Sequence, residues 1–296
     1  MNIPLDPQTL AVTPGAPLSL SKRKTKIRSV YSSKKHYKGL LEEHVSELSD
    51  LQRVMYAHGK YALLLIFQGM DAAGKDGAIR HVFSGVNPQG CQVFSFKQPS
   101  SEELDHDFLW RVHKRTPERG RIGIFNRSYY EEVLIVKAEP KILDAQRLPD
   151  ECRDRPNFWE ERYADINHFE DYLRRNGTVT LKFFLHLSYE EQRARFLSRI
   201  DDTDKNWKLT KADIESRSSW KTFQRVYEEC LTHTSTTAAP WFVIPADDKR
   251  NARLLISHVI VENLRKLPLA YPEATKAHQA ELQAIRHQLE KAKAKD

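Results

Sequence analysis

Cysteine and long apolar runs are scarce in this sequence, and each shortage excludes a class of protein. Three cysteines occur in 296 residues, at Cys91, Cys152 and Cys230, without the spacing of a zinc site or of a disulfide framework. No apolar run approaches the roughly 20 residues that span a bilayer, and no apolar signal core stands near the amino end. The sequence therefore predicts a cytoplasmic protein with reduced, inert thiols and no membrane partner.

Signatures of nucleic-acid binding are also missing. The chain has no helix-turn-helix, RNA-binding or zinc pattern, and its basic residues are not interleaved with stacking aromatics. It carries 47 Lys and Arg against 40 Asp and Glu, a net charge of +7 that favours an anionic partner by long-range steering. A chain with 40% hydrophobic and 29% charged residues has a soluble, globular composition, and its length suits one large α/β domain or two small ones.

A glycine-bracketed turn after an apolar run is the most informative feature that is present. Residues 61–77 read YALLLIFQGMDAAGKDG, in which Gly69, Gly74 and Lys75 match the first three fixed positions of the P-loop pattern G-x-x-x-x-G-K-[ST]. Asp76 stands where Ser or Thr would hold Mg²⁺. Such a loop turns backbone N–H groups toward a phosphate, and the lysine neutralises its charge. The alternative is an ordinary strand–turn–helix corner.

The order of the predicted elements indicates one α/β sandwich. Five segments have the length and hydrophobicity of strands, namely residues 61–67, 92–96, 121–125, 178–187 and 241–244. Helical spacing separates them, with Gly59 at the end of one helix and Asp247 or Asp248 at the start of another. Strands separated by helices pair in parallel, so we expect a three-layer α/β/α fold.

The two ends of the chain differ in composition from its middle. Residues 1–38 lack periodicity, and their stretch from Lys22 to Lys38 holds eight Lys and Arg and no acid. This basic arm is either solvated and packed on the domain surface, or a rim that gathers a polyanion. Residues 39–270 form the predicted domain. Residues 271–296 contain few large apolar side chains and predict a charged helix, for which subunit contacts are one use.

Polar residues follow the strand predicted at residues 121–125. They include Asn126, Arg127 and Glu131, which should face the P-loop because ligands collect at the carboxyl ends of parallel strands. An arginine there can grip a phosphate, and a glutamate can hold a metal or a sugar hydroxyl. Alternatively, Arg127 and Glu131 simply pair on a helix surface, because they stand four residues apart.

Basic residues interrupted by acids follow the strand predicted at residues 178–187. They are Arg193, Arg195, Arg199, Asp201, Asp202, Lys205, Trp207, Lys208 and Lys211, counting the one aromatic among them. Such a run at about residues 200–225 can form a mobile lid that closes over phosphates and excludes water. The alternative is a merely solvated helix.

Four motifs in order over roughly residues 10–270 resemble the polyphosphate kinase 2 family. They are GMDAAGKDG at 69–77, FNRSYYE at 125–131, DKNWKLTKADIESRSSW at 204–220 and TSTTAAPWFVIPADDK at 234–249. The loop FKQPSSEELDHDFLWR at 96–111 is most similar to the subgroup usually called class III. The resemblance implies a thymidylate-kinase-like P-loop kinase fold with a helical lid, Mg²⁺ dependence with Mn²⁺ as a substitute, and a homo-oligomer, dimer or tetramer.

The resemblance also implies the reaction, which is reversible phosphoryl transfer from inorganic polyphosphate to AMP and ADP with ATP as the product. The P-loop and lid alone would equally suit an ATP-dependent nucleoside monophosphate kinase. Family members restricted to one acceptor type commonly carry Asp and Asn where this chain has Asn126 and Glu131. This departure resembles class III, whose members use both monophosphates and diphosphates.

Site residues follow from the loop chemistry and the resemblance together. The residues expected to be catalytic are Asp71, Lys75, Asn126, Arg127, Glu131 and Arg199. Those expected to contact phosphate or polyphosphate are Gly69, Ala72, Ala73, Gly74, Asp76, Gly77, Arg195 and Lys208. Asp71 and Glu131 are the expected metal ligands, with Asp71 standing in for the missing Ser or Thr of the P-loop.

Overall fold

Short apolar segments form one parallel sheet in the computed structural model, which describes residues 3, 5–204 and 206–293. The strands are β1 (Ala62–Gln68), β2 (Cys91–Ser95), β3 (Ile122–Asn126), β4 (Thr178–His186) and β5 (Trp241–Pro245). Their order is β2-β3-β1-β4-β5, and every neighbouring pair runs parallel. The five predicted strands are confirmed, each within two residues of the expected bounds, and β1 lies at the centre of the sheet.

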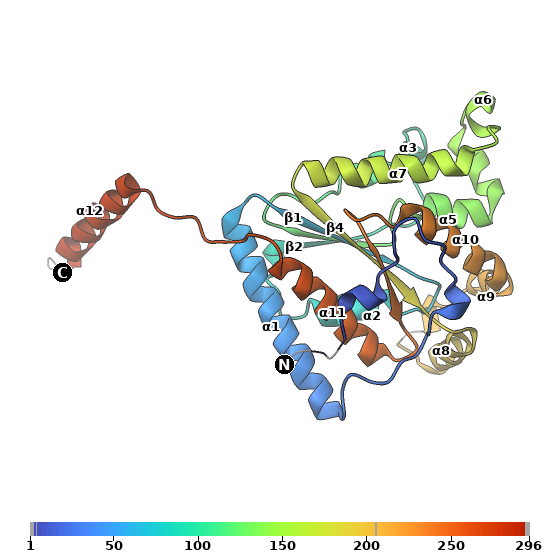
Figure 1. The fold of residues 1–296 in the computed structure, drawn as a ribbon, viewed down its shortest axis with the longest axis horizontal. Helices are drawn as coiled ribbons and strands as arrows, with labels where there is room; N and C mark the ends of the chain where they lie inside the picture. Colours follow the sequence, from blue (N-terminus) through green and yellow to red (C-terminus); the bar gives the residue numbers. More distant parts are fainter. Residues whose placement is uncertain (1–2, 4, 205, 294–296) are drawn as a thin grey trace.

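Helices cover both faces of this sheet (Figure 1). One face carries α1 (Lys34–His58), α2 (Lys75–Val82) and α11 (Lys249–Arg265), and the other carries α5 (Glu131–Ala138), α7 (Phe158–Arg175) and α10 (Trp220–Thr234). The remaining α-helices are α3 (Ser101–Leu104), α4 (Trp110–His113), α6 (Asp150–Arg153), α8 (Tyr189–Asp201), α9 (Lys211–Ser218) and α12 (Lys276–Lys293). Short 3₁₀ turns cover Pro7–Leu10, Leu20–Lys22, Pro88–Gly90, Pro140–Gln146 and Asn206–Lys208. The three-layer α/β/α fold is thus confirmed.

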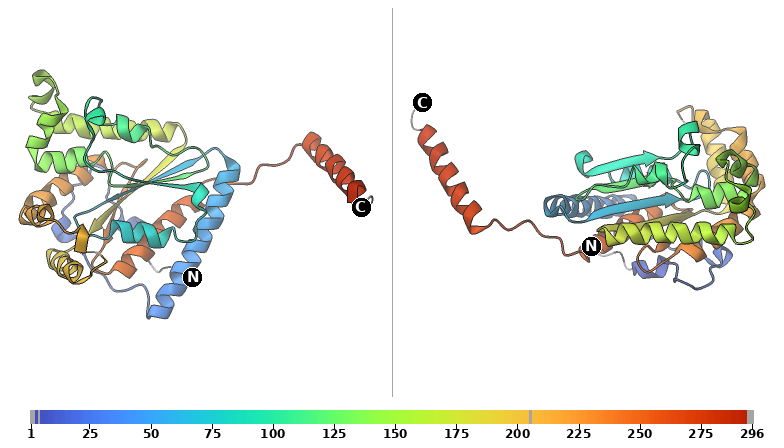
Figure 2. Two further views of the ribbon diagram at one scale, coloured as in Figure 1. Left: turned by 180° about the vertical axis from the view of Figure 1, so that it is seen from behind. Right: turned by 90° about the horizontal axis from the view of Figure 1, so that it is seen from above.

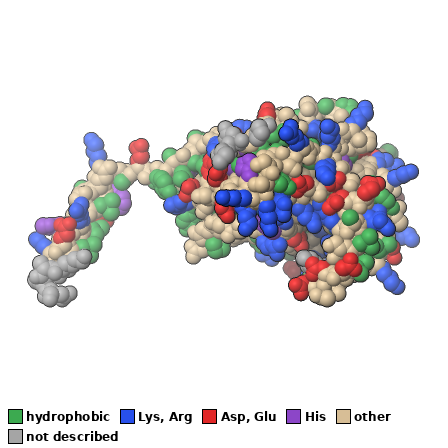
Figure 3. Space-filling model, turned by 90° about the horizontal axis from the view of Figure 1, so that it is seen from below, with side chains coloured by type: hydrophobic (Ala, Val, Ile, Leu, Met, Phe, Trp, Pro, Cys, Tyr) green, Lys and Arg blue, Asp and Glu red, His purple; other side chains and the backbone are tan. Residues whose placement is uncertain are grey.

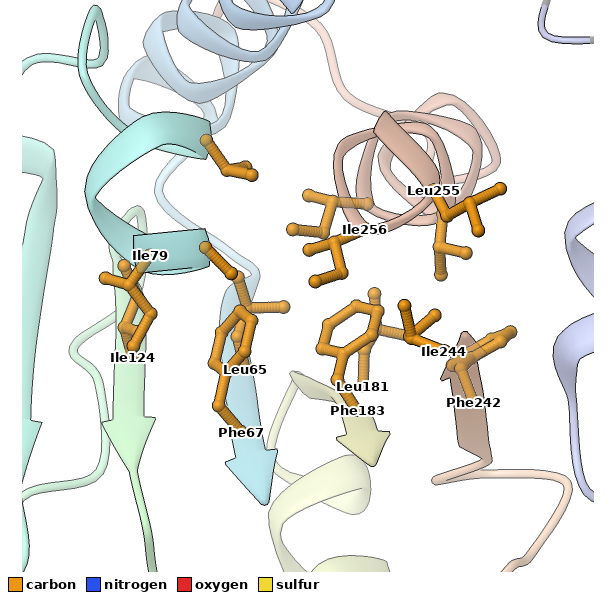
Figure 4. Close-up of a cluster of buried hydrophobic side chains, with 14 of the residues drawn as sticks. Leu65, Phe67, Ile79, Ile124, Leu181, Phe183, Phe242, Ile244, Leu255 and Ile256 are labelled. Atoms are coloured by element: carbon orange, nitrogen blue, oxygen red, sulfur yellow. The ribbon is translucent and has the colours of Figure 1, made fainter. Parts of the chain in front are cut away.

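Alternation along the strands divides the core into two layers. Leu63, Leu65 and Phe67 of β1 pack toward α11, whereas Leu64 and Ile66 pack toward the opposite helices. All five side chains are fully buried, as expected for a central parallel strand that helices cover on both faces. Figure 4 shows the first layer, where side chains of the sheet meet α2 and α11.

Capping residues place the ends of two long helices where the sequence predicts them. Gly59 ends α1 in the left-handed region, with φ at 67°, and its N–H donates to the oxygen of Met55. Asp248 begins α11, because its carboxylate accepts from the backbone N–H groups of Arg250 (2.8 Å) and Asn251 (3.2 Å). Of the two predicted caps for this helix, Asp248 is therefore the one that serves.

The amino-terminal arm is part of the core. Leu10, Val12 and Leu20 are buried, and Ala11 forms an antiparallel bridge with Phe242 of β5. The N–H of Val12 donates to the oxygen of Trp241 at 2.8 Å. Helix α1 begins at Lys34, within the range expected to be the arm. The arm therefore packs along the edge of the sheet more closely than a solvated segment would.

The carboxyl-terminal segment leaves the body of the molecule. Figures 1 and 2 show α12 at the end of an extended stretch, apart from the sheet and its helices in every view. Among the described residues, no helix combines the length and the hydrophobicity that crossing a bilayer requires.

A buried ion pair joins β4 to the helical layer that holds α7 and α10. Lys182 is fully buried, and its Nζ donates to Glu170 Oε2 (2.6 Å), Tyr130 Oη (2.8 Å) and the oxygen of Thr234 (2.6 Å). The hydroxyls of Tyr129 and Tyr130 both donate to Glu170 Oε1. Burial lowers the pKa of Lys182. The network therefore anchors the segment that follows β3.

Removing one member of this pair should destabilise the fold strongly. We expect Lys182→Met to lower the free energy of unfolding by about 3–5 kcal/mol, because Glu170 is left as an uncompensated buried charge. The double variant Lys182→Met with Glu170→Gln should recover much of that loss. Arg174→Met breaks an exposed ion pair on the same α7 and should cost at most about 1 kcal/mol. Urea unfolding measures all three, and equal losses for Lys182→Met and Arg174→Met would contradict the prediction.

Candidate active site

The P-loop joins the central strand β1 to α2. Gly69 has φ at 152°, and a Cβ there would lie 2.9 Å from the backbone oxygen of Leu185. Gly74 has φ at 101° and stands directly before the first residue of α2. Ala72, between the two glycines, also has a positive φ, of 62°, which is strained for a residue with a side chain. The turn thus takes the shape that the glycine spacing predicts.

Lys75 points back into the concave side of this loop. Its Nζ donates to the oxygens of Gly69 (2.5 Å) and Met70 (3.4 Å), and its side chain is buried. Burial, followed by the nearby Arg127 guanidinium, lowers the pKa of Lys75 to about 8. A phosphate in the loop would bring negative charge to this amine and raise that pKa again.

The first turn of α2 contacts the end of β3. Asp76 Oδ1 accepts a hydrogen bond from Asn126 Nδ2 at 2.8 Å. Asp76, which stands where the P-loop pattern has Ser or Thr, therefore contacts Asn126. Asn126 is one of the two positions at which this chain differs from family members restricted to one acceptor type. Gly77 follows in the same turn, and its carbonyl oxygen lies 2.8 Å from Nδ1 of His81.

Arg127 connects the end of β3 to the P-loop. Its guanidinium donates to Asp71 Oδ1 (3.0 Å) and to Glu131 Oε2 (3.1 Å), so one cation pairs with two carboxylates. Arg127 has φ at 62° and is therefore, like Ala72, a non-glycine residue with a strained backbone. The Arg127–Glu131 pair does form across one helical turn, but Glu131 is only 15% exposed and the arginine also reaches Asp71. The predicted approach of these two segments is confirmed.

Asp71 and Glu131 could serve as ligands of a divalent cation. Both place a carboxylate oxygen within 3.1 Å of the same guanidinium, so their charges converge on one region. No cluster of three or more His, Cys, Asp or Glu that could hold a metal occurs in the part of the chain that the structure describes. Mg²⁺ commonly binds one or two carboxylates and completes its shell with phosphate oxygens and water. The donor set therefore fits Mg²⁺ bound together with a phosphorylated substrate.

Arg195 corrects an expectation drawn from the sequence. Its nitrogen atoms donate to four backbone oxygens and one carboxylate, those of Ala72 (3.0 Å), Ala73 (2.9 Å), Ala246 (2.5 Å), Asp247 (3.2 Å) and Glu191 (2.8 Å). The side chain is only 5% exposed. Because protein acceptors occupy its donors, Arg195 is not placed to contact the distal part of a phosphate chain. It holds the P-loop against the segment after β5.

The other basic residues expected at the site lie on or beyond α8. Arg199 stands one turn after Arg195, is partly exposed, and has its guanidinium carbon 5.8 Å from the centre of the Phe196 ring. The predicted lid contains the 3₁₀ turn Asn206–Lys208 and α9 between α8 and α10. Lys205 and the side chain of Lys208 lie outside the described residues. The predicted contact of Lys208 with polyphosphate stays a prediction.

Two residues at the site, Gln192 and Arg217, are not among those predicted from the sequence. Gln192 is buried, and its Nε2 donates to the backbone oxygen of Asp71 at 3.0 Å. Its Oε1 accepts from Arg217 of α9 (3.0 Å), whose guanidinium also lies 3.4 Å from the centre of the Tyr189 ring. One amide therefore links the lid to the P-loop. The spacing of Gln192 and Arg195, three apart on one helix face, is the only available signal.

Comparisons with known proteins identify the family. A family model described as Polyphosphate kinase 2 matches residues 31–273. The chain belongs to the polyphosphate kinase 2 family. It is similar to the crystal structure of Polyphosphate Kinase 2 from Arthrobacter aurescens TC1, with a TM-score of 0.86 and 35% identity, over 97% of this chain and 99% of that one. The predicted P-loop kinase fold and phosphotransferase class are thereby confirmed.

Two curated members of the polyphosphate kinase 2 family are also similar over most of their length. The chain is 55% identical over 275 residues to the "ADP-polyphosphate phosphotransferase" of Rhodopseudomonas palustris, which covers 93% of this chain and 95% of the relative. It is 45% identical over 226 residues to the "AMP/ADP-polyphosphate phosphotransferase" of Meiothermus ruber, which covers 76% and 80% respectively. The two names differ in the acceptors that they mention.

The lowered pKa of Lys75 predicts a pH dependence for this family member. The protonated amine is expected to neutralise phosphate charge, and its pKa of about 8 means that this positive charge is lost as the pH rises. We therefore expect kcat/KM to fall about tenfold per pH unit well above pH 8, while the fall in kcat begins at higher pH because bound phosphate raises the pKa.

Lys75→Arg is the control for this profile. A guanidinium stays protonated to beyond about pH 12, so whatever activity this variant retains should show no fall between pH 8 and 10. A flat kcat/KM from pH 7 to 10 in the unaltered protein, with the fold intact by circular dichroism, would contradict the role of Lys75.

Proposed function

We propose that this protein transfers phosphoryl groups from inorganic polyphosphate to AMP and to ADP, with ATP as the end product. The observation that carries the proposal is that Arg127, at the end of the neighbouring strand β3, binds Asp71 of the P-loop and Glu131 and lies near enough to Lys75 to help lower its pKa. This arrangement presents two cations and two metal-binding carboxylates to a chain of phosphates. The names of the Rhodopseudomonas palustris and Meiothermus ruber relatives support polyphosphate as the donor.

Phosphoryl transfer requires positioning and charge neutralisation more than covalent help from the protein. A terminal phosphate oxygen of the acceptor attacks the last phosphorus of polyphosphate, the bridging P–O bond breaks, and a chain shorter by one phosphate leaves. Lys75 and the P-loop N–H groups hold the phosphoryl group in transit. Arg127 turns from its carboxylates toward non-bridging oxygens. Mg²⁺, held by Asp71 and Glu131, would neutralise further phosphate charge when bound, and Mn²⁺ can replace it.

The acceptor range follows from two residues beside the P-loop. Asn126 carries no charge and is hydrogen-bonded to Asp76, whereas Glu131 places its charge one helical turn further on. This moves the metal-binding charge along the acceptor, which lets the shorter AMP reach the donor. The Meiothermus ruber relative, whose name mentions both AMP and ADP, supports this range. If the assay described below shows phosphorylation of ADP but not of AMP, the enzyme is limited to ADP as acceptor.

The basic arm extends the phosphate site at the same edge of the sheet. Residues 20–26 line a pocket of about 490 Å³ together with residues 186–189 and the start of α10. Lys22, Lys24 and Lys26 in this stretch are exposed. Figure 3 shows Lys and Arg side chains gathered over the middle of one face of the body. Two interpretations of the arm were open, a solvated segment on the domain surface or a basic rim that gathers a polyanion. These observations support the second.

The arm is mechanically coupled to the P-loop through one aspartate. Asp247 Oδ2 accepts from Thr25 Oγ1 (2.8 Å) in the arm, and the backbone oxygen of Asp247 accepts from Arg195. Arg195 in turn holds the carbonyls of the P-loop. We infer that polyphosphate runs from the P-loop toward the arm, so that the reacting end and the captured chain share one rigid support.

Other expectations about this protein rest on the family resemblance or on composition. They are a homo-oligomer, dimer or tetramer, the absence of nucleic-acid and membrane partners, and a cytoplasmic location. The three cysteines are free thiols, and Cys230 is buried, which supports a reducing compartment.

The direct test uses polyphosphate as the sole donor. Purified protein with Mg²⁺, short-chain polyphosphate and AMP should form ADP and then ATP, and with ADP it should form ATP, both measured by chromatography of the nucleotides. Lys75→Ala should lower kcat about 10²-fold or more while the protein stays folded, because a preorganised charge is lost. Turnover of AMP only when ATP is added would replace the proposal with an ATP-dependent nucleoside monophosphate kinase. Turnover of ADP alone would remove AMP from the acceptor range.

Neutralising the arm should weaken polyphosphate capture without harming the chemical step. We expect Lys22→Ala/Lys24→Ala/Lys26→Ala to raise the KM for long-chain polyphosphate, to leave kcat nearly unchanged, and to reduce the dependence of KM on salt. The matched control neutralises three exposed lysines outside the arm and outside the pocket that it lines, as Lys266→Ala/Lys276→Ala/Lys291→Ala. Equal KM shifts in the two triple variants would show that only net charge matters and would overturn the arm's role.

A further inference from the structure

Side-chain donors hold each backbone carbonyl of residues 69–73 in the P-loop. Lys75 donates to the first two of these oxygens, and Arg195 donates to the last two. Gln192 holds the middle one, the oxygen of Asp71, through its Nε2 at 3.0 Å. Gln192 is therefore the neutral member of the set, and it acts on the residue whose carboxylate is an expected metal ligand.

The amide of Gln192 makes its two contacts in one orientation. Its Nε2 donates to the oxygen of Asp71, and its Oε1 accepts from Nη1 of Arg217 at 3.0 Å. A carbonyl oxygen only accepts and a guanidinium only donates, so a flipped amide would make neither hydrogen bond. Gln192 is 1% exposed, and losing either contact would leave a buried polar group without a partner. The contact with Arg217 thus fixes the contact with Asp71.

Arg217 is seated on the first turn of α8. Its Nη1 also donates to the oxygen of Tyr189 at 2.8 Å, and its guanidinium carbon lies 3.4 Å from the centre of the Tyr189 ring. The edge of Trp220 meets the same ring, with 5.2 Å between the ring centres. These contacts join α9 to α8, the two helices that lie side by side in Figure 1. Arg217 therefore ties the position of α9 to that of Gln192.

We propose that Gln192 and Arg217 are positioning residues for phosphoryl transfer, and we call these two side chains the α9 relay. Arg217 fixes the amide of Gln192, and Gln192 fixes the backbone of Asp71. The seating of α9 on α8 thus sets where the Asp71 carboxylate lies. This carboxylate also pairs with Arg127 at 3.0 Å, so a shift of the loop would displace both groups. The role in transfer rests on the proposed function, in which Asp71 serves the reaction.

Hydrogen exchange of the full chain without substrate, followed by mass spectrometry, tests the contacts of Gln192. Gln192→Glu keeps an acceptor for Arg217, but its ionised carboxylate cannot donate to the oxygen of Asp71. Gln192→Met removes both contacts and adds no charge. We expect both variants to speed exchange of the amides of residues 69–74 by roughly threefold or more, and Gln192→Met alone to speed exchange of α9. Unchanged exchange of the loop in both variants would overturn the proposal.

Arg217→Met tests the relay from its far end. Arg217 lies on α9 and reaches the P-loop through Gln192, so this variant should speed exchange of residues 69–74 as well as of α9. The matched control is Arg175→Met, which breaks an exposed ion pair with Asp171 on α7 and should leave the exchange of the loop unchanged. An effect of Arg217→Met that stays confined to α9 would overturn the relay.

Steady-state kinetics with ADP and polyphosphate separates positioning from binding. Gln192→Met and Arg217→Met should each lower kcat about tenfold and leave the KM for polyphosphate within about twofold, because a misplaced group costs rate more than affinity. The double variant should be no slower than Gln192→Met alone, since its second change removes a contact already lost. Additive losses, or a raised KM with an unchanged kcat, would assign Arg217 to direct contact with phosphate and overturn the relay.

Failure of the relay and failure of the proposed function give different results. If the unaltered protein does not turn over polyphosphate, the proposed function is wrong, while the exchange experiment still supports or overturns the relay because it needs no substrate. If Gln192→Met and Arg217→Met both keep the kcat of the unaltered protein, the proposed function stands and the relay is overturned.

Discussion

The buried guanidinium of Arg195 is the interaction on which the geometry of the site depends. It binds carbonyl oxygens of the P-loop on one side and of the segment after β5 on the other. The carbonyls of Ala72 and Ala73 accept from Arg195, whereas those of Gly69 and Met70 accept from Lys75. A buried cation whose donors are all satisfied thus holds two of the loop's carbonyls in place before any substrate arrives.

Charge balance is the second constraint on the site. Asp71 and Glu131 share the guanidinium of Arg127, and Lys75 is kept near its backbone acceptors in the loop. Without substrate, the site therefore neutralises its own charges instead of exposing them. The backbone is strained on both sides of the Arg127–Asp71 ion pair, at Ala72 in the P-loop and at Arg127 itself. In the proposed function, a phosphate that binds Arg127 would have to compete with these two carboxylates, so its recognition would involve an exchange of partners.

Strands, long helices and the P-loop could be predicted from the sequence because each depends on local patterns. The apolar run before Gly69 and the glycine after α1 fix their elements with little help from the rest of the chain. The support that Arg195 and Gln192 give to the P-loop could not be predicted, because their partners are carbonyls that only tertiary folding brings to α8. The docking of Val12 escaped for the same reason: its partner in β5 stands more than 200 residues away. The roles of the site residues toward phosphate and metal remain predictions.

The bridge between the amino-terminal arm and β5 has a consequence for how this chain folds. The strand β5 is the last strand in sequence and lies at an edge of the sheet, and Ala11 pairs with its Phe242. During synthesis the arm emerges well before β5, so its docking site is completed more than 200 residues later. Until then both the arm and the edge of β4 lack their native partners, and an unpaired edge invites association with other chains. Covering β5 with a segment more than 200 residues earlier in the chain thus leaves the arm without its native partner until β5 has been synthesised.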